Sequence, residues 1–378
     1  MKILIAPASF KGSLRAIETA EIISKAVHEA MPGVKTLKAP LADGGEGTLE
    51  ILIQQMGGKL FSSKVTDPLG RRIKAKYGIL ADEKTAVIEM AQASGLQLLN
   101  ARERNPLKTT TYGTGELIKN ALDHGVKRIL IGLGGSATVD GGAGMAQALG
   151  AKLLDKRGQQ IGFGGVQLSK IETIDPSHMD ARLTHTKFIA LCDVQSPLLG
   201  PQGARLYMPQ KGATPKITKA LEKNLAHFAR KVEKYLGKRV ENLPGAGAAG
   251  GLGSGLAAFL NAELRSGIEF ILDALKFEEK LKSCDLIISG EGRVDAQTAQ
   301  GKVIAGIAQL AKRHRKPLII ITGAKQGDLS KLYELGVAAV LSIMPSPMSE
   351  QEAMKNAKRF LREAVQELGK LLALSLRE

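Results

Sequence analysis

A glycine-rich segment with hydroxyl and carboxylate side chains follows one apolar strand of the sequence. Residues 132–144 read Gly-Leu-Gly-Gly-Ser-Ala-Thr-Val-Asp-Gly-Gly-Ala-Gly, between a predicted strand at 128–131 and a predicted helix at 143–149. A turn of this kind presents backbone N–H groups to an anion, and hydroxyls add further donors. The segment indicates a phosphate or nucleotide site, with a tight strand-to-helix turn as the alternative. The residues assigned to the site are Gly134, Gly135, Ser136, Thr138, Gly141 and Gly142.

Asp140 of this segment adds a carboxylate where a magnesium ion on a phosphate would lie. The chain has no Gly-x-x-x-x-Gly-Lys-Ser/Thr sequence, which excludes a P-loop. Residues 245–250 match the dinucleotide pattern Gly-x-Gly-x-x-Gly, but no apolar strand precedes them. We expect this second glycine run to pack closely against another part of the backbone, or to form a mobile connection.

Charged side chains gather in the segments that follow other predicted strands. Because ligands of open α/β sheets lie beyond the carboxyl ends of the strands, these segments predict a polar active site. The candidate residues near the two ends of the chain are Lys11, Asp43, Glu46, Glu291, Arg293 and Asp295. In the middle of the chain, Asp193 follows a strand at 187–192, and residues 210–212 form a loop with a lysine.

Strands and helices alternate at both ends of the chain, which predicts a parallel sheet with helices on both faces. The strands expected there are 2–6, 34–38, 285–289, 317–322 and 338–343. Five such strands suffice for a flavodoxin-like, doubly wound sheet. We therefore predict a discontinuous α/β domain formed by residues 1–60 and 284–378.

The middle of the chain has a different rhythm. Short strands at 59–65, 72–80 and 85–89 follow closely on one another, and Asp67-Pro-Leu-Gly70 is a turn sequence that joins the first two as an antiparallel hairpin. At 378 residues the chain is also longer than a single core supports. Residues 61–283 are therefore predicted to form a second α/β domain of mixed sheet, inserted into the first.

Composition narrows the functional classes. The net charge of +16 could indicate nucleic-acid binding, but only 4% of the residues are aromatic and there is no Trp to stack bases, so we expect no nucleic-acid partner. A basic surface also attracts small anionic substrates. The sequence contains no stretch of 18 apolar residues, so no membrane span is predicted. We expect Cys192 and Cys284 to be buried thiols in a reducing cytoplasm. The six histidines lack the spacing of zinc ligands, so we expect no zinc site.

The chain resembles the two-domain bacterial glycerate kinases in a series of motifs that run in order along it. They are Ala6-Pro-x-Ser-Phe-Lys-Gly-Ser-Leu14, Ala42-Asp-Gly-Gly-Glu-Gly-Thr48, Asp67-Pro-Leu-Gly70, Thr109-Thr-Thr-Tyr-Gly-Thr-Gly-Glu116, Gly134-Gly-Ser-Ala-Thr138, Asp140-Gly-Gly-Ala-Gly-Met145, Cys192-Asp-Val194, Pro209-Gln-Lys-Gly-Ala213, Gly245-Ala-Gly-Ala-Ala-Gly-Gly251 and Gly290-Glu-Gly-Arg-Val-Asp295. The chain departs from the family at Ala8, Val139 and Ser196, where Asp, Asn and Asn are common.

This resemblance implies a cytoplasmic enzyme that phosphorylates D-glycerate with ATP and Mg²⁺, and it favours the 2-hydroxyl as acceptor. A binding protein of the same fold that senses an organic acid or nucleotide is the alternative. Neither the oligomeric state nor the pathway follows from the sequence.

The catalytic candidates are Asp193, Lys11, Asp43 and Arg293. Arg293 or Lys11 would bind the glycerate carboxylate, and Asp193 or Asp43 would accept the hydroxyl proton. Mg²⁺ binds carboxylate oxygens while it retains several waters. The acids assigned to it are Asp193, Glu46, Glu291 and Asp295.

Overall fold

The computed structural model describes residues 1–296, 298–299 and 303–374. The chain divides into two compact units, of which unit 1 comprises Met1–Asp43 with Ile268–Glu378, and unit 2 comprises Gly44–Gly267. Among the described residues, no helix has both the length and the apolar character needed to cross a membrane.

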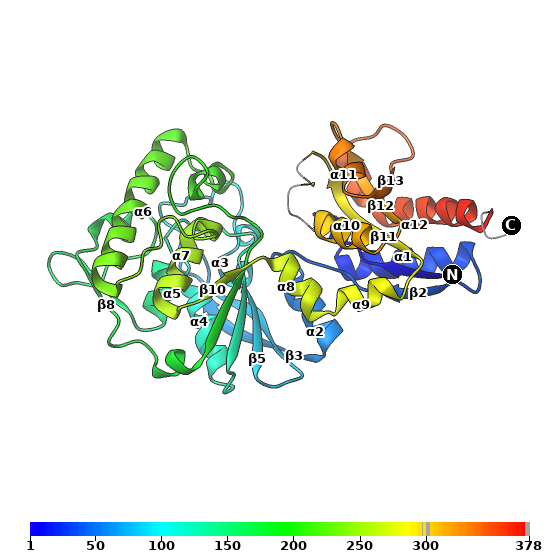
Figure 1. Ribbon diagram of the computed structural model, residues 1–378. Helices are drawn as coiled ribbons and strands as arrows, with labels where there is room; N and C mark the ends of the chain where they lie inside the picture. The colour runs from blue at the N-terminus through cyan, green and yellow to red at the C-terminus, as the bar shows by residue number, and fades with distance from the viewer. Residues whose placement is uncertain (297, 300–302, 375–378) are drawn as a thin grey trace. The chain divides into compact units, whose positions relative to one another are not determined.

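Unit 1 contains a five-stranded parallel sheet in the order β13-β12-β11-β1-β2. Its strands are β1 (Lys2–Ile5), β2 (Lys35–Lys38), β11 (Leu286–Val294), β12 (Leu318–Lys325) and β13 (Val337–Ser342). Numbered along the chain, this is the order 2-1-3-4-5 of the flavodoxin-like fold, as the sequence predicted. Figure 1 shows the blue N-terminal segment beside the yellow and orange C-terminal segment in this unit.

Helices cover both faces of this sheet because alternate strand residues point to opposite sides. Ile3 and Ile5 pack in one core with α1 and α12, while Leu4 points to the other face. The helix α10 contacts β11, but no residue of α10 belongs to that first core. The helices of the unit are α1 (Ala16–Ala30), α8 (Gly267–Ala274), α9 (Phe277–Lys282), α10 (Val303–Arg313), α11 (Ser330–Glu334) and α12 (Glu350–Leu374).

Unit 2 contains a six-stranded mixed sheet in the order β10-β9-β6-β5-β4-β3. Its strands are β3 (Gly58–Thr66), β4 (Arg72–Leu80), β5 (Thr85–Glu89), β6 (Arg128–Gly132), β9 (Lys187–Leu191) and β10 (Glu263–Arg265). The pairs β3/β4 and β4/β5 are antiparallel, and the remaining pairs are parallel. β7 (Lys152–Leu154) and β8 (Thr173–Asp175) form a separate two-stranded sheet.

The helices of unit 2 are α2 (Thr48–Met56), α3 (Ala91–Ser94), α4 (Tyr112–Leu122), α5 (Ala143–Ala148), α6 (Pro215–Leu236) and α7 (Ala248–Leu260), with short 3₁₀ turns η1 (Leu96–Leu98), η2 (Gln167–Lys170), η3 (Ala181–His185), η4 (Ala204–Tyr207) and η5 (Pro209–Lys211). Side chains of α4 and α7 pack with the sheet in one core. A second core surrounds α6, whose buried stripe includes Leu221, Leu225, Phe228 and Val232.

The unit boundaries differ from the predicted boundaries at 60/61 and 283/284. The helix α2 belongs to unit 2, because Leu49 and Ile53 pack over Gly78 of β4. The helices α8 and α9 belong to unit 1, where Ile268 and Leu272 pack over Gly306 of α10. Sequence periodicity does not reveal which sheet a helix covers. The first boundary was therefore placed one helix too far along the chain, and the second was placed two helices too far.

Two strands of unit 1 also continue further than predicted. β11 and β12 extend through residues 290–294 and 323–325, which we had interpreted as loops because of their glycines. The extensions pair with each other, Arg293 opposite Ala324 and Val294 opposite Lys325. The glycines are needed there because a Cβ on Gly323 would lie 2.5 Å from the carbonyl oxygen of Gly292.

Candidate functional site

The carboxyl ends of β5, β6, β9 and β10 lie along one edge of the unit 2 sheet, where parallel strands place ligands. The segment Gly44–Gly45 lies against this edge. A Cβ on Gly44, whose φ is +83°, would lie 2.7 Å from the carbonyl oxygen of Leu191 at the end of β9. A Cβ on Gly132 or Gly134 would overlap the backbone of Gly44 or Gly45. Glycines on both sides therefore let the chain approach the strand ends closely.

Asp193 is held at this edge, two residues after the end of β9. The Ser266 hydroxyl, which follows β10, donates a hydrogen bond of 2.9 Å to Asp193 Oδ1. The backbone N–H of Cys192 also donates to the carbonyl of Arg265 at 2.9 Å, which continues the pairing of the two strands. The Asp193 carboxylate is half-buried in this position. Its orientation is thus fixed from the neighbouring strand.

Glu89, a residue that the sequence analysis did not assign to the site, ends β5 at the same edge. Its side chain is buried and accepts hydrogen bonds from the Leu49 N–H at 2.9 Å and the Gln92 side chain at 3.3 Å. Burial raises the pKa of Glu89, the nearby Glu46 carboxylate acts in the same direction, and the donors oppose the shift. Glu46, a predicted magnesium ligand, therefore has a second acid close to it. The acid that directly follows the apolar run Ala86–Ile88 was the sequence signal for Glu89.

The glycine-rich segment divides into two parts with different surroundings. Gly135 is exposed with a φ of +71°, and Gly134 is half-buried at the end of β6. Gly141 and Gly142 are instead buried, and a Cβ on Gly141 would lie 2.8 Å from the ring of Phe228 in α6. The first part is accessible to a ligand, whereas the glycines of the second part are required by close packing inside the unit.

The second glycine run, 245–251, packs against the backbone of this glycine-rich segment. The N–H of Gly141 donates to the carbonyl of Gly250 at 3.2 Å, and a Cβ on Gly250 would overlap the carbonyl of Thr138. Residues 249–251 have positive φ, which produces a kink inside α7. The expected close backbone packing is confirmed.

Asp140 has a structural position. Its buried carboxylate accepts hydrogen bonds from the N–H and hydroxyl of Thr111 and from the N–H groups of Gly142 and Gly144, at 2.8–3.2 Å. Burial raises the pKa of Asp140, and these four donors oppose that shift. The structure does not support the expectation that Asp140 would hold magnesium, because the chain's own donors engage both of its oxygens.

Replacing Asp140 with asparagine is expected to lower the free energy of unfolding by about 2 kcal/mol, because an amide nitrogen would face backbone N–H groups that need an acceptor. Chemical denaturation measures the change. Asp123→Asn is the control, since Asp123 is an exposed acid paired with Arg182 and should cost well under ~1 kcal/mol. Equal stability of the two variants would contradict the capping role of Asp140.

Lys211 belongs to the loop 210–212 that the sequence analysis included among the charged segments, but it was given no role there. Its ammonium donates to the Ser136 hydroxyl at 2.7 Å and to the Thr138 carbonyl at 2.9 Å. Its position within the motif 209–213 was a signal, but contact with residues 75 and 73 positions away follows only from the folded chain. The Thr138 hydroxyl is buried and has no hydrogen-bond partner.

Unit 1 brings together four other predicted residues at the end of its own sheet. Glu291 and Arg293 lie on the extension of β11, and a Cβ on the intervening Gly292 would lie 3.2 Å from the backbone nitrogen of Lys11. The Thr298 hydroxyl donates to Glu291 at 3.0 Å and accepts from the N–H of Asp295 at 3.1 Å. The Nε of Arg293 lies 3.9 Å from an Asp295 oxygen.

The predicted metal ligands are divided between the two units. Asp193 and Glu46 belong to unit 2, while Glu291 and Asp295 belong to unit 1, whose first segment ends with Asp43. In the part of the chain that the structure describes, no group of three or more His, Cys, Asp or Glu side chains is arranged to hold a metal ion.

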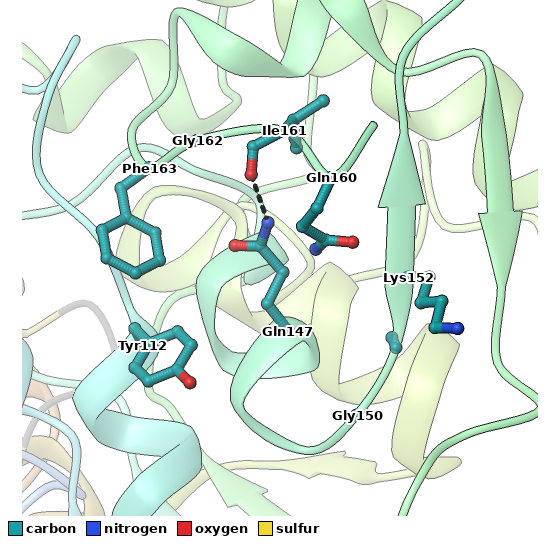
Figure 2. Close-up of a pocket in the computed structure, with 9 residues that line it drawn as sticks. Tyr112, Gln147, Gly150, Lys152, Gln160, Ile161, Gly162 and Phe163 are labelled. Atoms are coloured by element: carbon teal, nitrogen blue, oxygen red, sulfur yellow. Dashed lines mark hydrogen bonds between the residues drawn. The ribbon is translucent and has the colours of Figure 1, made fainter. Parts of the chain in front are cut away.

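A pocket of about 490 Å³ lies in unit 2 near the end of α5 (Figure 2). Tyr112 and Phe163 form one side of it, with their ring centres 5.0 Å apart. The Gln147 side chain donates to the carbonyl of Ile161 at 2.9 Å. No predicted site residue lines this pocket.

Comparison with known proteins gives matches along nearly the whole chain. The sequence model of the glycerate kinase family matches residues 3–373. The chain is 46% identical to a glycerate kinase of Bacillus subtilis (strain 168), over 99% of this chain and 98% of that protein. It is 47% identical to a glycerate 2-kinase of Escherichia coli (strain K12), over 100% and 99%.

One solved structure is similar over the same length. It is the crystal structure of a Salmonella typhimurium LT2 protein assigned as glycerate kinase 2, with a TM-score of 0.85 and 45% identity. The similarity covers 100% of this chain and 99% of that chain. The fold described above is therefore also the fold of that protein.

Proposed function

This chain belongs to the glycerate kinase family, and we propose that it transfers a phosphoryl group from ATP to the 2-hydroxyl of D-glycerate. The observation that carries this proposal is the placement of Asp193 and of the Gly134–Ser136 segment after the adjacent parallel strands β9 and β6. A carboxylate and a phosphate-binding turn are the two parts that phosphoryl transfer to an alcohol needs in the same place.

The reaction forms a bond between the glycerate hydroxyl oxygen and the γ-phosphorus, and it breaks the bond from that phosphorus to the oxygen of ADP. The hydroxyl proton passes to a carboxylate, for which Asp193 is our first candidate and Asp43 the second. The hydrogen bond from Ser266 to Asp193 Oδ1 holds the carboxylate in place for this role.

Three groups support ATP phosphates as the ligand of the turn. Gly135 is exposed and lacks a side chain that would block approach to the backbone. The Thr138 hydroxyl is buried without a partner, and the Lys211 ammonium lies behind Ser136. Of these, the Thr138 hydroxyl is a donor that the protein leaves unused, and an anion engages such donors.

Magnesium, when bound, would neutralise phosphate charge and link the nucleotide to the protein. One or two carboxylates suffice for it, because phosphates and waters supply the remaining ligands. Asp193 and Glu46 are the candidates in unit 2, and Glu291 and Asp295 are those in unit 1. For the glycerate carboxylate we propose Arg293 or Lys11, since a guanidinium suits a bidentate contact.

A coupled assay of ATP consumption with D-glycerate tests the proposed activity, and proton-coupled ³¹P NMR of the product tests its position. A phosphate on carbon 2 has one neighbouring proton and gives a doublet, whereas a phosphate on carbon 3 gives a triplet. We expect the doublet. A triplet would overturn the assigned hydroxyl, and ATP binding without turnover would favour a binding protein of the same fold.

The proposed partner is a small molecule, with no role for nucleic acid. We place the reaction in the cytoplasm, because Cys192 and Cys284 are both buried and unpaired. Burial, together with the neighbouring Asp193 charge, raises the pKa of the Cys192 thiol to about 11, which favours the protonated thiol at neutral pH.

A further inference from the structure

Lys211 has a position that is unusual for a lysine, because the protein encloses its whole side chain. It is 2% exposed, and it ends the 3₁₀ turn η5. The next residue, Gly212, has a φ of +93°, and a Cβ there would overlap the carbonyl of Arg104. Close packing of this turn aims the lysine at the glycine-rich segment.

The contacts of Lys211 determine how Ser136 can hydrogen-bond. When Lys211 is protonated, its ammonium group only donates, so the Ser136 hydroxyl oxygen is then the acceptor of the 2.7 Å bond from Nζ. The hydroxyl proton of Ser136 must then point away from the lysine. Ser136 directly follows the exposed Gly135, so this proton becomes a donor at the carboxyl end of β6.

The positive charge of Lys211 has no counter-charge beside it. Among the residues that the structure describes, no carboxylate lies within 4.0 Å of its Nζ. Asp140 is the acid that acts on it, and it does so only at longer range. Burial lowers the pKa of Lys211 to about 7, and Asp140 opposes this shift. A buried charge without a partner is costly, and a bound anion would remove that cost.

We infer that Lys211 is a positioning residue for phosphate at the glycine-rich segment. Its ammonium orients the Ser136 hydroxyl as a donor towards the phosphate and supplies positive charge behind it. The inference rests on the proposed function in one respect, because ATP is the anion that we assign to this segment.

A measurable consequence is proton uptake on binding. At about pH 8, Lys211 is mostly neutral in the free protein, since its pKa is near 7. A phosphate next to Ser136 favours the ammonium form and raises this pKa. The complex therefore takes up protons from the buffer, up to one for each ATP bound.

The experiment is a calorimetric titration with Mg-ATP at about pH 8, without glycerate, in two buffers of different ionisation enthalpy. The wild-type protein should show proton uptake. Lys211→Met should abolish the uptake and raise the Kd by about tenfold, the value of one charge-assisted hydrogen bond. Lys280→Met is the matched control, because burial also lowers the pKa of Lys280, which lies in α9 of unit 1; it should change neither quantity.

If Lys211→Met does not fold, Ser136→Ala provides a second test of the inference. It should weaken Mg-ATP binding by a similar factor, and the double variant should be no weaker than either single one. Unchanged proton uptake in Lys211→Met, unchanged affinity in Ser136→Ala, or no binding of Mg-ATP by the wild type would overturn the inference. If the wild type binds Mg-ATP with proton uptake but does not phosphorylate D-glycerate, the proposed function fails and the role of Lys211 stands.

Discussion

Replacing Asp193 with asparagine is expected to lower kcat by roughly a hundredfold or more, with little change in the melting temperature. The amide has nearly the shape of the carboxylate and can still accept the hydrogen bond from Ser266. It cannot take a proton from the substrate hydroxyl, and it is a poor ligand for Mg²⁺. The loss therefore falls on the transition state rather than on the folded chain.

The competing interpretation is that Asp193 only stabilises the turn after β9. Asp155 provides the control for it, because its carboxylate accepts hydrogen bonds from the N–H groups of Arg157 and Gln159 in an exposed turn of the same unit. Asp155→Asn should lower the melting temperature slightly and leave kcat intact. If Asp193→Asn behaved in the same way, Asp193 would have no part in the mechanism. Initial rates and thermal unfolding of both variants decide the question.

Replacing Gly135 with valine is expected to raise the KM for ATP by about ten- to a hundredfold, the value of losing one or two hydrogen bonds to a charged group. Gly135 has a φ of +71°, which a β-branched residue adopts only under strain. A Cβ would lie 3.4 Å from the Cβ of Ala91, so the fold has room for it. The side chain would instead stand on the exposed turn that we assign to phosphate.

Gly158→Val is the matched control for this variant. Gly158 has a φ of +73° with open space around it, so valine carries the same backbone strain at a site distant in sequence from the turn. Both variants should lose similar stability, about 1–2 kcal/mol. Only Gly135→Val should change the KM for ATP. A folded Gly135→Val protein with a normal KM would mean that the segment is only a turn between strand and helix.

Local patterns in the sequence predicted most of the architecture. The alternation of strands and helices gave the flavodoxin-like sheet, and the turn at residues 67–70 gave the antiparallel hairpin β3/β4. The extensions of β11 and β12 were missed because their glycines resemble those of a loop. Those glycines serve close strand contact, a property that depends on the partner strand and not on the segment itself.

The site was less predictable for the same reason. Gly141 and Gly135 look equivalent in the sequence, yet Gly141 packs against Phe228 while Gly135 is exposed. Asp140 looked like a metal ligand until the donors around it were known. Lys211 and Glu89 are buried by contacts with residues far away in the sequence, and sequence patterns do not reveal such burial. The roles assigned to Asp193, Lys11 and Arg293 stay predictions.

The interrupted layout of unit 1 has a consequence for the order of folding on the ribosome. β1 pairs with β11, and the Ser289 hydroxyl donates to the carbonyl of Ala6 across 283 residues of chain. Unit 2 is continuous, and all of it leaves the ribosome before β11 does. The first two strands of unit 1 must therefore wait with an unpaired edge while unit 2 folds, and sheet edges of this kind recruit other chains. Nascent glycerate kinase of this type should depend on chaperones most during that interval, and it should depend on them less once β11 has left the exit tunnel.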